Sequence, residues 1–153
     1  MRVRVVKSKS QSEGKIFEEL FKQQAQYLGL LPIKQHLSAR MLHGGRVKVT
    51  KSDLDFRLIT REGRVGFFDC KSYGKDSFSY SQIDENQLNL ANLYHEWGVP
   101  SGFVVWFRPA NRVTFFSGPA IVSKGPQSSF GPEDGQYIGR FERFDLRLVM
   151  GEK

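Results

Sequence analysis

The chain has 153 residues, of which 39% are apolar and 25% are charged, a composition typical of one globular domain and not of a disordered segment. Its apolar runs are far shorter than the ~20 residues of a membrane-spanning helix. The basic N-terminus is not followed by the apolar stretch of a signal peptide. Cys70 is the only cysteine, so no disulfide can form within the chain. We therefore expect a single domain over residues 1–153 in a reducing cytoplasm.

Positive charge is the first indication of a partner. Lysine and arginine total 23 against 16 aspartate and glutamate residues, which gives a net charge of +7. No acidic residue lies between Leu20 and Ser52, whereas this stretch contains Lys22, Lys34, Arg40, Arg46, Lys48 and Lys51. Such a separation of sign favours binding to the phosphates of a nucleic acid, although basic proteins also use their charge for solubility alone.

The first third of the chain predicts one helix. Residues 1–13 are polar and basic and are expected to form an arm. From about Gly14 to Tyr27, apolar residues repeat every three to four positions, which predicts a helix that ends near Gly29. Residues 36–51 hold two glycines between basic stretches, and they fit either a hairpin or a flexible excursion from the core.

The middle of the chain predicts two neighbouring strands and a second helix. Apolar and charged residues alternate over 53–58, as expected of a strand. A turn over 61–64 leads into a second strand, Val65 to Lys71. The second helix is expected over about Ile83 to Trp97, because Gly98 and Pro100 follow it.

The last third is less regular. Residues 102–107 and 113–116 predict a strand hairpin, whereas residues 117–136 are dense in glycine, proline and serine and predict a surface loop. Residues 137–149 fit a strand or a helix equally well. The order of the elements predicts an α/β fold with a central mixed sheet flanked by helices.

Two carboxylates and a lysine form the central chemical pattern. Asp69 and Lys71 share one face of the second strand, because side chains repeat every second position, and Asp55 can lie across from them on the neighbouring strand. Converging carboxylates suit Mg²⁺, which prefers oxygen ligands and keeps several waters. Two acids and a lysine on a solvated hairpin are the plainer interpretation. The apolar run that leads into Asp69 favours the metal site.

Other residues extend this pattern. Gln87 lies on the apolar face of the second helix, formed by Ile83, Leu90, Ala91, Tyr94 and Trp97. A buried glutamine needs hydrogen-bond partners, so it either ties the helix to a strand or faces the metal site. Glu18 and Glu19 on the first helix offer a further acid, and periodicity does not choose between them. Cys70 points away from Asp69 and fits a small core residue.

Four segments carry short motifs in a fixed order. They are Gly14-Lys15-Ile16-Phe17-Glu18, Lys51-Ser52-Asp53-Leu54-Asp55, Phe68-Asp69-Cys70-Lys71, and the Gln87-bearing helix with the strand after it. Together they resemble the PD-(D/E)xK nuclease superfamily and, within it, the RecU-like and archaeal-type Holliday junction resolvases, many of them bacterial or phage-encoded. The match spans about Gly14 to Phe107.

This resemblance implies a restriction-endonuclease-like core and a homodimer that cuts four-way DNA junctions in recombination and repair, using Mg²⁺ or, in its place, Mn²⁺. It favours Glu18 over Glu19, because the glutamate of the family follows an aromatic residue. The implied catalytic residues are Glu18, Asp55, Asp69, Lys71 and Gln87, the first three as metal ligands. The implied DNA contacts are Lys34, Arg40, Arg46, Lys48 and Lys51, together with the arm. A restriction- or repair-type nuclease on linear DNA and an inert DNA-binding module of the same fold are the alternatives.

Overall fold

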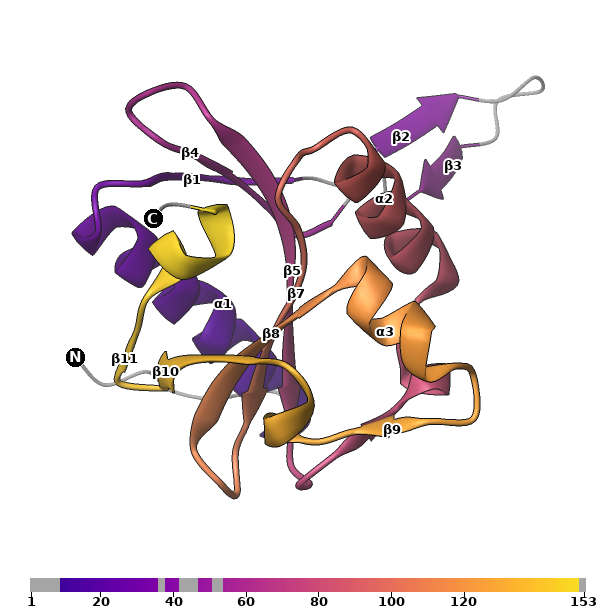
Figure 1. The fold of residues 1–153 in the computed structure, drawn as a ribbon. Helices are drawn as coiled ribbons and strands as arrows, with labels where there is room; N and C mark the ends of the chain where they lie inside the picture. Colours follow the sequence, from indigo (N-terminus) through magenta and orange to yellow (C-terminus); the bar gives the residue numbers. More distant parts are fainter. Residues whose placement is uncertain (1–8, 36–37, 42–46, 51–53, 152–153) are drawn as a thin grey trace.

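A seven-stranded mixed sheet divides the molecule into two halves, as the computed structural model shows (Figure 1). The structure describes residues 9–35, 38–41, 47–50 and 54–151, and it describes side chains over 12–35 and 54–151. Helix α1 covers one face of the sheet, and helices α2 and α3 cover the other (Figure 1). Each face therefore has its own apolar core.

The helices are α1 (Lys9–Tyr27), α2 (Glu85–Glu96) and α3 (Gly118–Lys124), with short 3-10 turns at Tyr80–Gln82, Pro132–Asp134 and Leu146–Met150. The strands are β1 (Leu31–Lys34), β2 (Ser38–Met41), β3 (Val47–Thr50), β4 (Phe56–Ile59), β5 (Val65–Tyr73), β6 (Phe78–Ser79), β7 (Ser101–Phe107), β8 (Arg112–Ser117), β9 (Ser129–Phe130), β10 (Gln136–Arg140) and β11 (Arg143–Phe144).

The strand order across the sheet is β1-β4-β5-β7-β8-β10-β11. All neighbours are antiparallel except β5 and β7, which run parallel and pair from Phe67 with Ser101 to Tyr73 with Phe107. A parallel pair needs a long crossover, and the segment that contains α2 supplies it. This crossover places α2 directly over the strand that carries Asp69 and Lys71.

The α1 face is packed with aromatic side chains. Phe17 and Phe21 of α1 are fully buried, and Phe21 stacks on Phe56 of β4 with ring centroids 4.8 Å apart. The C-terminal segment closes the same core, because Phe144 and Leu146 are also buried there. Burial of this apolar area fixes α1, and with it Glu18, against the β1–β4 edge of the sheet.

The opposite core lies under α2 and α3. Phe103, Val105 and Phe107 of β7 point into it, and Leu88 and Ala91 of α2 cover them. Phe67 of β5 stacks on Tyr94 of α2 with ring centroids 4.3 Å apart. Helix α2 is therefore held to β5 near its C-terminal end and to β7 along its middle.

Most elements agree with the sequence-based expectations, and the structure settles two open ones. Residues 38–41 and 47–50 pair as an antiparallel hairpin outside the main sheet, and the two glycines between them lie outside the described residues. The C-terminal region combines both alternatives, because β10 and β11 precede a 3-10 turn. Helix α1 starts at Lys9, so the arm predicted over 1–13 is wrong from Lys9 onward.

The surface loop predicted over 117–136 is also wrong. Ser117 caps α3 by accepting a hydrogen bond from the Ala120 N–H, and Pro119 occupies the first turn, where its missing N–H is harmless. Ile121 and Phe130 are fully buried in the α2–α3 core.

Among the described helices, none combines the length and apolarity needed to span a lipid bilayer.

Candidate active site

Two aspartates meet at the end of the β4–β5 ladder. Phe56 pairs with Phe68, which brings Asp55 and Asp69 to adjacent strands at the same level. The Asp55 N–H donates to Oδ1 of Asp69 at 3.2 Å, and the Cys70 N–H donates to Oδ2 of Asp55 at 3.1 Å. Each carboxylate therefore accepts a main-chain hydrogen bond from the other strand. These reciprocal bonds fix the spacing of the two acids.

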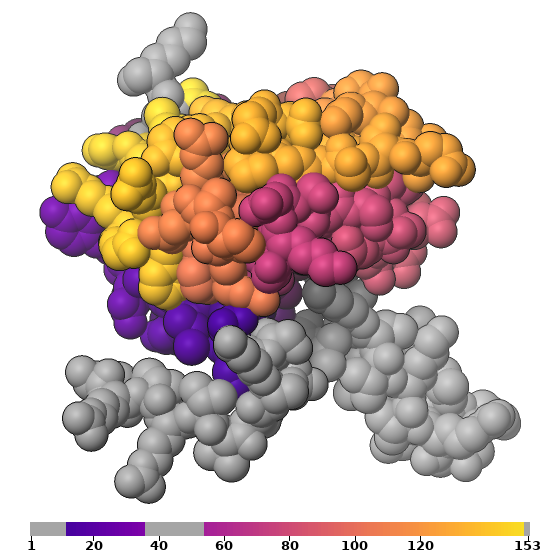
Figure 2. All heavy atoms as spheres, turned by 90° about the horizontal axis from the view of Figure 1, so that it is seen from below, coloured from indigo at the N-terminus to yellow at the C-terminus, as the bar shows by residue number. Residues whose placement is uncertain are grey.

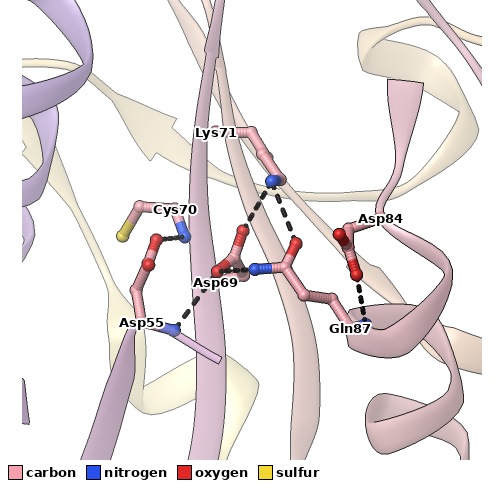
Figure 3. A network of polar contacts seen from close by, with 6 residues as sticks. All are labelled: Asp55, Asp69, Cys70, Lys71, Asp84 and Gln87. Carbon is pink, nitrogen blue, oxygen red and sulfur yellow. Dashed lines mark hydrogen bonds and ion pairs between the residues drawn. The ribbon is translucent and has the colours of Figure 1, made fainter. Parts of the chain in front are cut away.

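Asp69 lies in a polar network with Lys71 and Gln87 (Figure 3). It is fully buried, and its Oδ2 lies 2.8 Å from the Lys71 Nζ. The Gln87 Nε2 donates to Oδ1 of Asp69 at 2.8 Å, and the Gln87 Oε1 accepts from the Lys71 Nζ at 3.1 Å. Burial of a carboxylate is unfavourable unless it is paired and hydrogen-bonded, and this network supplies both.

The first turn of α2 positions Gln87. Asp84 is the N-cap, and its side chain accepts from the Gln87 N–H at 3.0 Å. The spacing from Asp84 to Gln87 is that of a capping box, in which the third residue would bond back to the cap. Here the Gln87 side chain bonds to Asp69 and Lys71 instead. The cap thus orients Gln87, which contacts Asp69 and Lys71. The Asp-x-x-Gln spacing in the sequence could have identified Asp84 as the N-cap.

The prediction that Gln87 lies on the apolar face of the second helix is confirmed. Gln87 is 3% exposed, so it does lie on the buried face of α2. Trp97 does not share that face, because it is 80% exposed beyond the end of the helix. The helix ends at Glu96, and Gly98 takes a positive φ of 76°, so the chain turns before Trp97 can continue the apolar stripe.

Glu18 lies on the α1 side of the site. Its Oε2 lies 2.7 Å from the Nζ of Lys34 at the end of β1, whereas Glu19 is exposed. Burial lowers the pKa of Lys34, but the hydrogen bond and charge of Glu18 and the charge of Asp55 raise it overall. The pKa of Lys34 therefore depends on both Glu18 and Asp55. Among the described residues, it is Glu18 that pairs with Lys34.

The pKa of the Cys70 thiol depends on Glu18, Asp55 and Asp69. Its thiol lies on the opposite side of β5 from the Lys71 ammonium (Figure 3), as predicted. Burial raises the pKa of this thiol well above its usual value, and the charges of Asp55, Asp69 and Glu18 raise it further. The thiol is therefore held protonated, which does not suit a nucleophile. Glu18, Asp55 and Asp69 all act on this thiol through their charge.

Beyond Lys71, β5 is tied to the turn between β7 and β8. The Arg108 N–H donates to the Tyr73 carbonyl at 3.0 Å, and the Arg108 Nη1 donates to the Ser72 Oγ at 2.7 Å. Arg108 also forms an ion pair with Glu13 of α1 at 2.8 Å. Figure 2 shows this end of the molecule, where the β5–β6 connection lies beside the β7–β8 turn. Arg108 thus links α1 to the strand of the site.

The donor chemistry fits a hard divalent cation. The three acids supply only carboxylate oxygens, the donors that Mg²⁺ prefers, and Mg²⁺ in proteins commonly takes one or two carboxylates and retains water. Within the described residues, no three His, Cys, Asp or Glu side chains are arranged to hold a metal ion by themselves. Glu18 is held by Lys34, and Oδ1 of Asp69 by Gln87. The residues fit the ion in kind, and its binding would require some of these contacts to rearrange.

Only one of the expected DNA-contact residues falls among the described side chains. Lys34 is half-exposed and faces Glu18. Arg40 and Lys48 lie on β2 and β3, whose side chains the structure does not describe, and Arg46 and Lys51 lie outside the described residues. Their contact with DNA stays a prediction.

The mixed sheet, with α1 on one face and α2 on the other, gives the chain a restriction-endonuclease-like α/β fold. The chain is structurally similar to Hjc, a Holliday junction resolvase from the archaeal hyperthermophile Archaeoglobus fulgidus. The TM-score is 0.56 at 11% sequence identity, and the match covers 81% of this chain and 95% of that one. Scans against protein-family models and curated proteins find no match. The fold is thus shown by structural similarity.

Proposed function

We propose that this protein is a Mg²⁺-dependent DNA endonuclease that cleaves branched DNA, with the four-way junction as its preferred substrate. The observation that carries the proposal is the buried Asp69–Lys71–Gln87 network beside Asp55. It lies where the β4–β5 ladder ends, in a fold shared with a Holliday junction resolvase. A buried acid held against a lysine in this way is costly for stability alone, which favours a catalytic use.

Asp55 and Asp69 would hold the metal ion, with Glu18 as a third carboxylate. When bound, Mg²⁺ would lower the pKa of a water and stabilise negative charge on the phosphate. Asp55 is half-buried and bonded to the Cys70 N–H, so its carboxylate is already oriented by the main chain. The Gln87 Nε2 keeps Oδ1 of the buried Asp69 in place in the same manner.

Lys71 would act on the attacking water or on the phosphate. Its ammonium has three N–H donors, and in the described part of the chain two of them face Asp69 and Gln87. The third can donate to a water or to a phosphate oxygen that gains charge in the transition state. The side chain is 22% exposed, so substrate can reach it.

The basic residues of 34–51 and the N-terminal arm would contact phosphates. Such contacts position DNA without reading its sequence, and they weaken as salt rises. A homodimer would carry two sites related by a two-fold axis, which matches the two equivalent strands of a symmetric junction. Arg40→Ala with Arg46→Ala and Lys48→Ala should therefore weaken junction binding and flatten its dependence on salt.

The direct test is cleavage of labelled four-way junction, flap and linear duplex of equal length, with Mg²⁺, Mn²⁺, Ca²⁺ or a chelator. We expect paired nicks in the junction with Mg²⁺ or Mn²⁺ and little cleavage with Ca²⁺, because Ca²⁺ is larger and holds its ligands in a looser geometry. Asp69→Asn should abolish cleavage and leave DNA binding similar or stronger. Lys71→Ala should lower turnover severely, and Lys71→Arg should not restore it, because a planar guanidinium cannot replace a compact ammonium.

The outcomes separate the alternatives. Equal cleavage of linear duplex and junction, or a monomer in solution, would assign the protein to the restriction- or repair-type nucleases. DNA binding with no metal-dependent nicking would indicate an inert binding module. Normal cleavage by Asp69→Asn would remove this site from consideration.

A further inference from the structure

Lys34 lies where a cation would be expected beside the acid cluster. Its Nζ is 2.7 Å from the Glu18 Oε2, and it lies over the Phe56 ring at 5.4 Å from the centroid. Lys34 pairs with Phe56 in the β1–β4 ladder, and the next residue donates its N–H to the Asp55 carbonyl at 2.8 Å. The sheet therefore places the main chain of Lys34 beside that of Asp55, and the ammonium lies over Phe56 and against Glu18.

Glu18 has little freedom to move away from this lysine. Phe17 and Phe21 on either side of it are fully buried, and Phe21 is stacked on Phe56. Helix α1 is thus fixed on β4, the strand that begins directly after Asp55. The side chain of Glu18 can turn, but its backbone stays beside Lys34. Any cation that uses Glu18 must compete with this ammonium for it or lie close to a like charge.

We propose that Lys34 is an internal counter-ion of the metal site, so that a divalent ion which binds Glu18 and Asp55 displaces the Lys34 ammonium from Glu18. The inference rests on the proposed function, because it assumes that these acids hold a metal. It accounts for the ion pair that occupies Glu18, while the described residues form no ready metal cluster. In the absence of metal and DNA, Lys34 would neutralise Glu18. Once displaced, its ammonium would be available to bind a phosphate of the DNA.

Metal affinity without DNA tests this proposal. Mn²⁺ is titrated into the protein, and the free ion is followed by its electron paramagnetic resonance signal, which disappears on binding. Lys34→Met removes the charge and keeps an apolar stem over Phe56. We expect this variant to bind Mn²⁺ about three- to tenfold more tightly than wild type, since a partly exposed competing charge is removed. Lys34→Gln, which keeps a donor for Glu18 but no charge, should shift affinity in the same direction.

Two controls make the result specific. Arg61→Met removes the same charge from the exposed turn between β4 and β5, at the opposite end of β4 from Asp55, and should leave Mn²⁺ affinity within about twofold of wild type, because distant surface charges are screened. Glu18→Gln combined with Lys34→Met should lose the gain, because the acid that Lys34 neutralises is gone. Thermal unfolding of each variant establishes that it is folded.

Equal Mn²⁺ affinity in wild type and both Lys34 variants would overturn the inference and leave the proposed function standing. An equal gain from Arg61→Met would overturn it as well, because the effect would then be one of net charge. No Mn²⁺ binding by any variant would overturn both this inference and the metal part of the proposed function.

Discussion

Replacement of Gln87 by methionine tests the network that holds Asp69. Methionine matches the length of glutamine without its amide, so Gln87→Met removes two hydrogen bonds and leaves the α2 cap in place. The lost bonds are the 2.8 Å contact to Asp69 and the 3.1 Å contact to Lys71. Asp69 is fully buried and Gln87 is 3% exposed, so water cannot easily replace the missing donor.

The expected loss follows from these two bonds. A buried hydrogen bond to a charged group contributes about 1.5–3 kcal/mol, and the partly buried bond to Lys71 should contribute about 0.5–1.5 kcal/mol. The two share one side chain and are not independent, and the apolar methionine recovers part of the loss. We therefore expect the free energy of unfolding to fall by about 2–4 kcal/mol. That is a large share of the ~5–15 kcal/mol typical of a domain.

Urea unfolding at neutral pH measures this loss. Gln23→Met places the same substitution on the exposed face of α1 and should change stability by less than about 0.5 kcal/mol. A double-mutant cycle with Asp69→Asn should give a coupling energy of at least about 1 kcal/mol between Gln87 and Asp69. A loss below about 1 kcal/mol in Gln87→Met, or no coupling, would refute the argument that Gln87 stabilises the buried carboxylate.

Two further predictions concern residues that flank the site. Burial and then the Asp69 charge raise the pKa of Tyr73 to about 12, so the folded state holds the phenolic proton more tightly than the unfolded chain. This contribution to stability is present below the unfolded pKa of ~10 and is lost as pH rises toward the folded value. Between about pH 9 and pH 11 the wild type should lose up to about 1 kcal/mol more than Tyr73→Phe, measured by urea unfolding, and parallel curves would contradict this. Asp84→Ala removes the α2 cap and should lower stability by about 1 kcal/mol, whereas Asp84→Asn should retain most of it; equal losses would show that the cap does not act through its oxygen.

Local periodicity predicted the part of the site that lies on regular elements. The alternation that ends in Asp55 and the strand over 65–71 identified β4 and β5, and their short connection made them neighbours. The apolar wheel of the second helix identified Gln87 as buried. These arguments worked because a strand repeats every two residues and a helix every 3.6, so the residue positions alone decide which face a side chain takes.

Contacts between distant segments were beyond such reasoning. The pairing of Glu18 with Lys34 depends on how α1 crosses the β1–β4 edge, and no local pattern encodes that crossing. The same holds for Arg108, which joins Glu13 to Ser72 from the far end of β7. The prediction of a surface loop over 117–136 was wrong for another reason. Glycine and proline mark helix ends as well as loops, and α3 is too short to show periodicity.

The distribution of charge indicates how a metal ion would approach. On the α2 side of β5, the charge of Asp69 is matched by Lys71 at 2.8 Å, and both its oxygens face donors. On the α1 side, Glu18 is paired with Lys34, and the charge of Asp55 also acts on Lys34. Glu18 and Asp55 are partly exposed, whereas Asp69 has no exposed surface. A divalent ion would therefore meet accessible carboxylate oxygens on the α1 side first. Because Asp55 and Asp69 are joined by the Asp55 N–H bond, an ion held by Asp55 would lie next to Asp69 without a large movement of the backbone.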